Sequence, residues 1–384
     1  MPVPADHDTS VLIIGGGIGG LTTSLALRHY GIDSVVFEQA EDLVKTQVGS
    51  GLSLGVNVAR AFKHLELLDE LAELAAPIKR VNYRNEKGEH LGSMPMSQEG
   101  ELAQGVIRPA FHEFLVDKVG EENVQVGAKL ERFEQDGGGV TAHFADGRTA
   151  RGEVLVGADG FDSTVRTQLL GKSERRYAGY RTRRGVLETE FAKEGMFGII
   201  MGPGERFLFY PVGRWWMYWT AANFEPPGGK QSQAEIKQTV LERFSGWPTP
   251  VESLVENTDE SRTFIQDTYD RNPVKAWGEG RVTLLGDAAH PMTWDRGQGA
   301  GQAIEGAVLL ARELSRSGDR AAALRAWEAE RIPRTTKMVR YSRQVGRIQQ
   351  SGNPAVCFYR EKVMLPVMTK RVSKKGTADL LVDY

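Results

Sequence analysis

Residues 11–20 read VLIIGGGIGG, an uninterrupted apolar run followed by a turn rich in glycine. The apolar run, residues 11–14, predicts a buried parallel strand. Beyond the glycines, the leucines of residues 21–27 recur at helical spacing, and residues 34–38 (SVVFE) predict a second strand. Strand, helix and strand predict a βαβ unit, in which the crossover is right-handed.

The glycines have the spacing of a dinucleotide-binding turn, Gly15-x-Gly17-x-x-Gly20, with Ile18 and Gly19 inside it. The first glycine permits a tight turn, the second lets the backbone approach a pyrophosphate, and the third lets helix and strand pack closely. The helix N-terminus offers unpaired N–H groups to the phosphates. Glu38 ends the next strand, where its carboxylate suits ribose hydroxyls. The pattern predicts a dinucleotide site but does not choose between NAD and FAD.

The composition is that of an ordinary globular protein: 384 residues, 40% hydrophobic, 26% charged, with a net charge of −2. This length exceeds what one core usually serves, so we expect two lobes. The small net charge creates no field that would draw the chain to nucleic acid or to a membrane surface. The single cysteine, Cys357, excludes a disulfide framework or a cysteine-based metal site and fits a cytoplasmic setting. No stretch approaches the ~18 apolar residues of a membrane span. Monomer and homodimer both remain open.

Patterns along the rest of the chain divide it into two kinds of structure. Helices are expected at residues 57–74 and after Pro109, a hairpin at 81–91, a meander over 124–150 and a separate apolar strand at 153–156. Strand-like runs dominate residues 178–268, around a helix at 233–244. The α/β pattern resumes at 281–287, and long helices are expected at 299–316 and 319–347.

Two further motifs and one arginine distinguish between the possible cofactors. Gly157-Ala158-Asp159-Gly160 resembles the DG motif of class A flavoprotein monooxygenases, and Gly286-Asp287-Ala288-Ala289-His290-Pro291 resembles their GD motif. Arg108 lies where that family has an arginine in contact with the flavin. The motifs follow the family's order over roughly residues 10–345. The chain therefore resembles the FAD-dependent aromatic hydroxylases with the para-hydroxybenzoate hydroxylase fold.

This resemblance and the patterns together predict an α/β fold, with a Rossmann-like FAD-binding lobe, an inserted and mostly antiparallel β-sheet lobe for the substrate, and long C-terminal helices. The expected boundaries are residues 1–75, 101–177 and 270–350 for the FAD-binding lobe, 76–100 and 178–269 for the substrate lobe, and 351–384 for a C-terminal helical tail.

Asp287 ends a buried strand, where a carboxylate can accept hydrogen bonds from ribityl hydroxyls. The glycines of residues 297–301 then open a second helix N-terminus, which can stabilise negative charge on a reduced flavin. The cofactor contacts expected from the motifs and the resemblance are Gly15, Gly17, Ile18, Gly19, Gly20, Glu38, Gln39, Gly51, Arg108, Asp159, Asp287, Pro291, Gly297, Gly299, Ala300 and Gly301.

Aromatic residues crowd two neighbouring strands of the expected substrate lobe. Since side chains alternate between the faces of a strand, one set is expected to face the flavin and a planar, apolar substrate. Phe209, Pro211 and Trp219 are the candidates for lining that pocket. Of the neighbouring arginines 181, 183 and 184, one could anchor a phenolate or carboxylate and the others are expected in solvent. No catalytic residue is fixed; the candidates are Arg184, Tyr210, His290 and Trp294, of which His290 is more often structural in the family.

The resemblance implies a single-component monooxygenase. In that family NAD(P)H reduces FAD, O2 adds at flavin C4a, and the hydroperoxide passes one oxygen atom to an aromatic or polyketide-like small molecule. A flavin-dependent halogenase or a prenyl-lipid reductase is the alternative, as is a flavoprotein that binds FAD without turnover. The halogenase motif W-x-W-x-I-P is only loosely matched by residues 215–219.

The nicotinamide cofactor has no second glycine fingerprint to bind it, which fits this family. NADPH is expected, with NADH as the alternative. Lys45 and Arg60 are possible partners for the additional phosphate of NADPH.

Overall fold

The apolar run near the start of the chain forms β1 (His7–Ile14), which pairs in parallel with both of its neighbours at the centre of a mixed sheet here named sheet A. The computed structural model describes residues 7–43, 50–98 and 100–375. Sheet A has the order β10-β11-β12-β1-β2-β9, with β18 beside β12. Its other strands are β2 (Ser34–Phe37), β9 (Val124–Gln125), β10 (Leu130–Gln135), β11 (Val140–Phe144), β12 (Thr149–Gly157) and β18 (Val282–Leu284).

Strand β12 corrects one expectation, because the end of the meander and the apolar strand at 153–156 form one continuous strand. Its first half pairs antiparallel with β11, from Thr149 to Gly152. Its whole length also pairs parallel with β1, from Ala150 to Gly157. The break expected between them is absent because Arg151 and Gly152 keep the extended geometry that both partners require.

The helix expected over residues 57–74 is two helices, α2 (Val56–His64) and α3 (Leu68–Leu74). Glu66 has φ of 61°, the left-handed conformation that ends a helix. The Leu67 N–H then bonds Phe62 O at 2.8 Å, and the Glu66 N–H bonds Lys63 O. This Schellman-type ending was not visible in the apolar pattern, because no glycine marks it.

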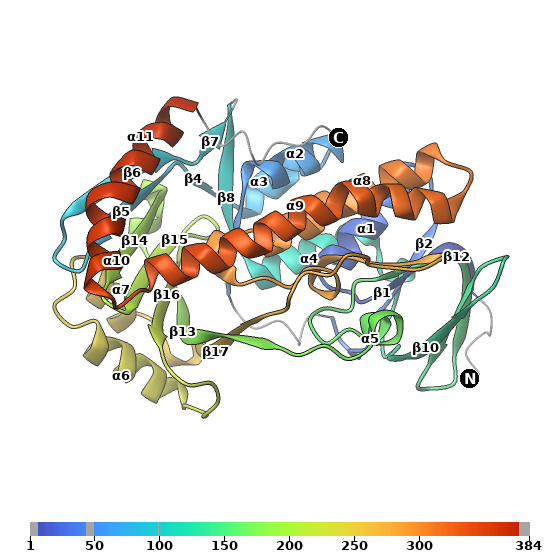
Figure 1. Cartoon of the computed structure of the whole chain (residues 1–384), viewed down its shortest axis with the longest axis horizontal. Helices are drawn as coiled ribbons and strands as arrows, with labels where there is room; N and C mark the ends of the chain where they lie inside the picture. The colour runs from blue at the N-terminus through green and yellow to red at the C-terminus, as the bar shows by residue number, and fades with distance from the viewer. Residues whose placement is uncertain (1–6, 44–49, 99, 376–384) are drawn as a thin grey trace.

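The other end of the molecule holds a mostly antiparallel sheet, here named sheet C (Figure 1). Its order is β17-β13-β16-β15-β14-β5-β6, and within it β14 and β5 pair in parallel. The strands are β5 (Arg80–Asn85), β6 (His90–Pro95), β13 (Arg176–Glu188), β14 (Met196–Gly202), β15 (Glu205–Pro211), β16 (Trp216–Phe224) and β17 (Thr263–Asp270). The α/β fold with an inserted antiparallel sheet is thus confirmed, although β17 had no clear strand signal.

A third, smaller sheet is here named sheet B, and its strands come from residues 51–107 of the chain. It has the order β3-β8-β4, with β7 beside β8. Its strands are β3 (Gly51–Leu54), β4 (Ala76–Ile78), β7 (Ser97–Gln98) and β8 (Glu101–Ile107).

The long helices predicted near the C-terminus are confirmed as α8 (Gly299–Arg316) and α9 (Arg320–Gln349). In Figure 1, α9 runs along the molecule from the region of sheet A to that of sheet C. The remaining helices are α1 (Ile18–His29), α4 (Arg108–Val119), α5 (Thr164–Leu170), α6 (Gln233–Arg243), α7 (Val251–Glu256), α10 (Pro354–Tyr359) and α11 (Leu365–Lys375), with a π-helical segment at Arg360–Met364. Short 3-10 turns lie at Glu121–Asn123, Glu190–Glu194, Glu260–Arg262, Gly286–Ala288 and Trp294–Arg296.

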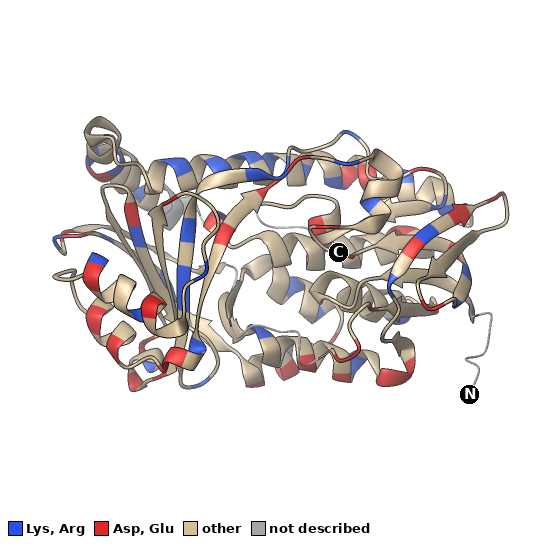
Figure 2. Cartoon of the chain, turned by 90° about the horizontal axis from the view of Figure 1, so that it is seen from below, with Lys and Arg blue, Asp and Glu red and all other residues tan. Residues whose placement is uncertain are grey.

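Charged residues of both signs are interspersed over the helices and strands in Figure 2, as the small net charge leads one to expect. Among the residues that the structure describes, no helix has both the length and the hydropathy needed to cross a bilayer.

Candidate functional site

The glycine turn at the end of β1 leaves no room for side chains at two of its three glycines. Gly15 has φ of 109°, and a Cβ there would lie 2.4 Å from Ala158 O. A Cβ on Gly20 would lie 1.9 Å from Gly15 O. Gly17 differs, because nothing lies within 4 Å of its Cβ position and it faces a cavity. The turn therefore presents open space at the N-terminus of α1, as an approaching phosphate requires.

A cavity of about 1060 Å³ extends from this turn to one face of sheet C. It is large enough for ligands bigger than most single small molecules, whose pockets measure about 300–1,000 Å³. Ten of the expected cofactor residues line it: Gly17, Ile18, Gly19, Gly51, Arg108, Asp287, Pro291, Gly297, Gly299 and Ala300. These residues come from sequence positions far apart, and the fold brings them together along one side of the cavity.

Arg108 and Asp287 both line the cavity, and their opposite charges attract each other. The surrounding protein desolvates both groups, which raises the pKa of the Asp287 carboxyl and lowers that of the Arg108 guanidinium. The attraction between them opposes both shifts, and the Arg184 charge adds to the lowering at Arg108. No hydrogen bond from the Arg108 guanidinium is formed among the described residues, so this donor group is available to a ligand.

Asp159 lies beside the cavity and holds the start of α5. Its Oδ2 accepts a hydrogen bond from the Val165 N–H at 3.1 Å, whereas its Oδ1 is buried without a hydrogen-bond partner among the described residues. Burial raises the pKa of this carboxyl. A buried acceptor without a partner is uncommon in proteins and fits a polar group bound next to it.

Glu38 lies at the end of β2, within reach of the glycine turn. Its Oε2 accepts a hydrogen bond from the Gly16 N–H at 2.7 Å, and its Oε1 accepts one from the Ala40 N–H at 2.9 Å. The contacts hold the carboxylate at the edge of the turn, although Glu38 does not itself line the cavity. Among the other expected contacts, Gln39 is exposed and Gly301 is buried within α8.

At the end of the cavity away from the glycine turn, the wall is one face of sheet C, and it is the face opposite to the one expected to contact a substrate. Leu208 and Tyr210 of β15, and Tyr218 and Thr220 of β16, line the cavity. Phe209 and Trp219 point to the other face, where they pack in an apolar cluster with α6 and α7. Trp219 also donates a hydrogen bond to Thr258. The expectation that Phe209 and Trp219 line the pocket was therefore wrong. Alternation along a strand separates the side chains into two sets, but it does not show which set faces the cavity.

Pro211, the third candidate for the substrate pocket, is not among the residues that line the cavity. Its carbonyl instead lies against sheet B, where a Cβ on Gly105 would be 1.8 Å from Pro211 O.

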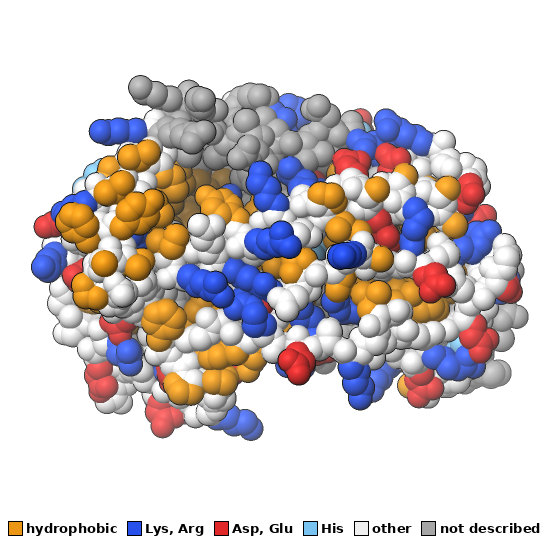
Figure 3. Space-filling view, in the orientation of Figure 1, with side chains coloured by type: hydrophobic (Ala, Val, Ile, Leu, Met, Phe, Trp, Pro, Cys, Tyr) orange, Lys and Arg blue, Asp and Glu red, His pale blue; other side chains and the backbone are white. Residues whose placement is uncertain are grey.

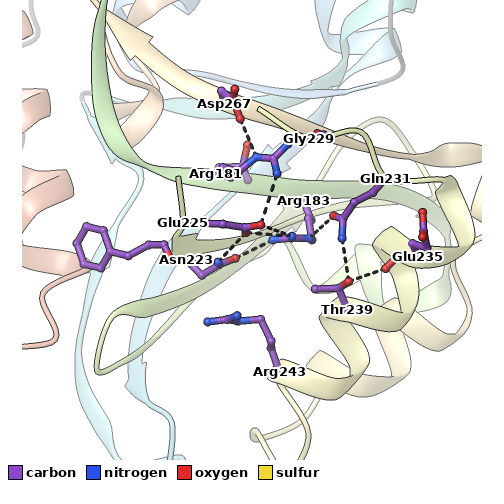
Figure 4. A network of polar contacts seen from close by, with 12 residues as sticks. Arg181, Arg183, Asn223, Glu225, Gly229, Gln231, Glu235, Thr239, Arg243 and Asp267 are labelled. Atoms are coloured by element: carbon purple, nitrogen blue, oxygen red, sulfur yellow. Dashed lines mark hydrogen bonds and ion pairs between the residues drawn. The ribbon is translucent and has the colours of Figure 1, made fainter. Parts of the chain in front are cut away.

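Two of the three neighbouring arginines of β13 are buried in ion pairs rather than solvated (Figure 4). The Arg181 guanidinium lies 2.7 Å from Asp267, and that of Arg183 lies 3.0 Å from Glu225. Burial lowers the pKa of Arg183, which the Glu225 charge opposes. Arg184 lies on the opposite face of the strand and lines the cavity, because neighbouring residues in a strand alternate. The pattern of three arginines therefore contains one candidate for ligand binding.

Trp294 is fixed in the cavity wall by a buried ion pair that the sequence analysis did not identify. The Arg206 guanidinium lies 2.7 Å from the Asp295 carboxylate and 4.3 Å from the centre of the Trp294 ring. The Tyr180 hydroxyl donates a short hydrogen bond to the same carboxylate, and the Trp294 N–H donates to Thr268 Oγ1 at 3.2 Å. The only signal for Arg206 was its period-two spacing with Leu208 and Tyr210 on an otherwise apolar strand.

His290 lies outside the cavity, buried against the ring of Trp277. Burial, aided by the Arg331 charge, lowers its pKa to about 3, so the ring is neutral near pH 7. A group that neither faces the cavity nor titrates near neutral pH is not placed to exchange protons with a ligand.

We expect His290 to destabilise the fold as the pH falls. Because its folded pKa of about 3 lies below the unfolded value of 6.5, the unfolded chain binds the extra proton between these values. Stability from this group is complete above pH 6.5 and falls by at most about 1.4 kcal/mol per pH unit below it. Urea unfolding measures the free energy of unfolding at pH 6.5 and at pH 4.5. Between these values, the decrease in that free energy should be about 2 kcal/mol smaller in His290→Gln than in the unchanged protein. Equal losses would contradict the assignment.

The two residues suggested for the NADPH phosphate are not grouped at this site. Arg60 pairs with Glu101 at 3.1 Å and is not among the cavity residues. Lys45 lies outside the residues that the structure describes.

Comparison with known proteins agrees with the fold and with this geometry. Residues 8–342 match the family described as FAD binding domain. The chain is 40% identical to aurachin C monooxygenase/isomerase of Stigmatella aurantiaca, covering 97% of both chains. It is 33% identical to an FAD-dependent urate hydroxylase of Klebsiella pneumoniae, covering 87% of this chain and 88% of the other. The crystal structure of Klebsiella pneumoniae HpxO with FAD and uric acid superposes with a TM-score of 0.89, at 30% identity, covering 97% of this chain and 96% of that one.

The fold and the cavity define a flavoprotein of the oxygenase type. The chain belongs to the class A FAD-dependent monooxygenases, within the FAD binding domain family. Its own residues fit FAD: open space at Gly17, a partnerless buried oxygen on Asp159, and Asp287 and Arg108 facing the cavity.

We predict that Asp287→Ala and Arg108→Ala each weaken FAD retention about 10- to 100-fold, since each removes a charged group that can hydrogen-bond the cofactor, an interaction of about 1.5–3 kcal/mol. The measurement is the FAD dissociation constant of the stripped and reconstituted protein. Asp33→Ala is the control, because Asp33 is exposed on the same end of the molecule and does not line the cavity. Unchanged FAD affinity and unchanged flavin reduction in both cavity variants would contradict the assignment.

Proposed function

We propose that this chain uses NAD(P)H and O2 to hydroxylate or epoxidise a planar aromatic or polyketide-like small molecule. One observation carries the proposal: a single cavity joins the glycine turn, Arg108 and Asp287 to an apolar face of sheet C. A dinucleotide cofactor at one end and an organic substrate at the other would share this space. The urate hydroxylases and aurachin C monooxygenase/isomerase support oxygenation of a small molecule by analogy, since their names describe that reaction.

In this proposal the residues of the turn and of the cavity wall hold the cofactor. The N–H groups around Gly17 would receive the pyrophosphate, and Glu38 the ribose. Asp287 would accept hydrogen bonds from the ribityl chain, and the guanidinium of Arg108 would contact the flavin. The N-terminus of α8, at Gly299, would face negative charge on the reduced ring.

When bound, FAD would accept electrons from NAD(P)H and activate O2, so that one oxygen atom can be transferred to the substrate. The chain's own contribution is to bind, orient and exclude water. Arg184 lines the cavity and forms no ion pair among the described residues. Its Nε donates to Thr182 Oγ1 at 3.0 Å, and its charge acts on both Arg108 and Tyr210. It would orient a phenolate, carboxylate or ring carbonyl of the substrate. Trp294, whose ring centre lies 5.8 Å from the Arg184 guanidinium, would limit the position of the substrate ring.

The test is oxygen incorporation by the purified FAD-loaded protein with NADPH or NADH, isotopically labelled O2 and a panel of phenols and nitrogen heterocycles. The expected result is substrate-stimulated NAD(P)H oxidation with one labelled oxygen atom in the product. Halide-dependent product, or flavin that is never bleached by either nicotinamide with any compound, would contradict the proposal.

A further inference from the structure

The far end of the cavity is an apolar chamber between sheet C and α11. Its side chains come from β5, from β6 and the residue after it, and from β14, β15, the π-helical segment and α11. They are Val81, Tyr83, Met94, Met96, Phe197, Ile199, Leu208, Tyr210, Met364 and Met368. Most of them belong to one apolar cluster. We name this space the methionine chamber, since Met94, Met96, Met364 and Met368 all face it.

The π-helical segment and α11 together present side chains in three distinct directions. Met364 and Met368, one turn apart, line the cavity. Leu365 and Thr369 are buried at 0% and 4% exposure. Val363 and Val367 are exposed, at 45% and 62%. Figure 3 shows apolar side chains gathered at the end of the molecule where α10 and α11 lie.

The position of α11 is fixed by a close approach to β6. Gly92 has φ of 149°, and a Cβ there would lie 2.5 Å from the Thr369 hydroxyl. Any side chain at Gly92 would push the helix away. The glycine therefore lets α11 pack directly against β6 and form one wall of the cavity. This wall lies outside the matched FAD binding domain, residues 8–342.

The chemistry of the chamber selects for a hydrocarbon chain rather than a second polar group. Methionine side chains are unbranched and polarizable, so they adapt to flexible apolar ligands. The Arg206 cation at the border is already engaged, since it pairs with Asp295 and lies over Trp294. Burial raises the pKa of Tyr83 to about 12, so this phenol stays neutral. Arg184, by contrast, lies where the apolar chamber meets the cofactor end.

We infer that the substrate is a planar ring carrying a hydrocarbon chain, with the ring beside Arg184 and Trp294 and the chain in the methionine chamber. This rests on the proposed function only for the reaction at the ring. The π-helical segment and α11 are then the part of the protein that selects substrates by the length of their hydrocarbon chain.

The experiment measures binding of para-methylphenol, para-pentylphenol and para-nonylphenol to the FAD-loaded protein, from the change in flavin absorbance, without a nicotinamide. Affinity should rise about fourfold for each methylene buried, until the chamber is filled. Met364→Gln and Met368→Gln should reduce that gain per methylene, because each places a polar amide in the chamber at similar side-chain length. Val363→Gln and Val367→Gln, on the outer face of the same segment, should leave the gain unchanged.

Equal affinity across the three phenols, or the same gain in the Met364 and Val363 variants, would overturn the inference. If Met364→Gln fails to fold, Met96→Gln tests the opposite wall in the same way. Because binding is measured without turnover, chain-length dependence in the absence of oxygen transfer would support the chamber and contradict the proposed reaction. Oxygen transfer without chain-length dependence would do the reverse.

Discussion

Gly17→Ala should fold normally and yet bind FAD about 10- to 100-fold more weakly. Gly17 has φ of −79° and ψ of −178°, which any residue adopts, and nothing lies within 4 Å of its Cβ position. The added methyl group would point into the space that we assign to the pyrophosphate. Forcing such a contact costs about 1–3 kcal/mol. The measurements are thermal unfolding of the FAD-stripped protein and the FAD dissociation constant.

Gly20→Ala is the matched variant, because it changes the same motif with the opposite outcome. Its Cβ would lie 1.9 Å from Gly15 O, so the strand and helix must separate. We expect the stripped protein itself to lose about 3 kcal/mol or more. Two results would contradict these roles of Gly17 and Gly20. In one, both variants bind FAD more weakly while the stripped proteins are equally stable; in the other, both stripped proteins lose the same free energy of unfolding.

Asp295→Leu should cost about 3–5 kcal/mol of unfolding free energy, because it leaves Arg206 charged and buried without its carboxylate. Both side chains are almost completely buried, at 1% and 0% exposure. Trp294 should lose its fixed position at the same time, since the Arg206 guanidinium lies 4.3 Å from its ring. Urea unfolding and tryptophan fluorescence measure the two effects.

The double variant Arg206→Met with Asp295→Leu should recover most of this loss, because two apolar side chains can replace a buried ion pair. Glu153→Leu is the control: it breaks the partly exposed pair with Arg320 and should cost no more than about 1 kcal/mol. Losses that simply add in the double variant would show that Arg206 and Asp295 act independently.

The sequence was sufficient to predict residues that line the cavity beside the glycine turn, because that end of the cavity depends on the backbone. A turn without room for Cβ atoms at Gly15 and Gly20 requires glycine, and the 3-10 turn that follows β18 places the Asp287 carboxylate in the cavity wall. Such requirements are local, so they leave a readable pattern in a single segment of chain. The long helices α8 and α9 were predictable for the same reason.

The substrate end was not predictable because it depends on contacts between distant segments. Tyr210 and Phe209 are equally aromatic, and only the packing of α6 and α7 against one face decides which of them lines the cavity. Arg206 pairs with Asp295 across 89 positions of the sequence, and neither residue type indicates the other. The wall formed by α11 depends on Gly92, whose role appears only when Thr369 is placed beside it.

The pairing of β12 with both β1 and β18 has a consequence for synthesis of the protein. Strand β1 is complete at Ile14, but its neighbour β12 ends at Gly157 and β18 only at Leu284. At about 10 residues per second, the ribosome needs on the order of half a minute to make the chain between the first and the last of these strands. During that time Val11, Leu12 and Ile13, which are almost completely buried in the finished protein, belong to an incomplete sheet. Strand β1, which leads into the glycine turn, is therefore the strand of sheet A that the nascent chain must protect longest from aggregation.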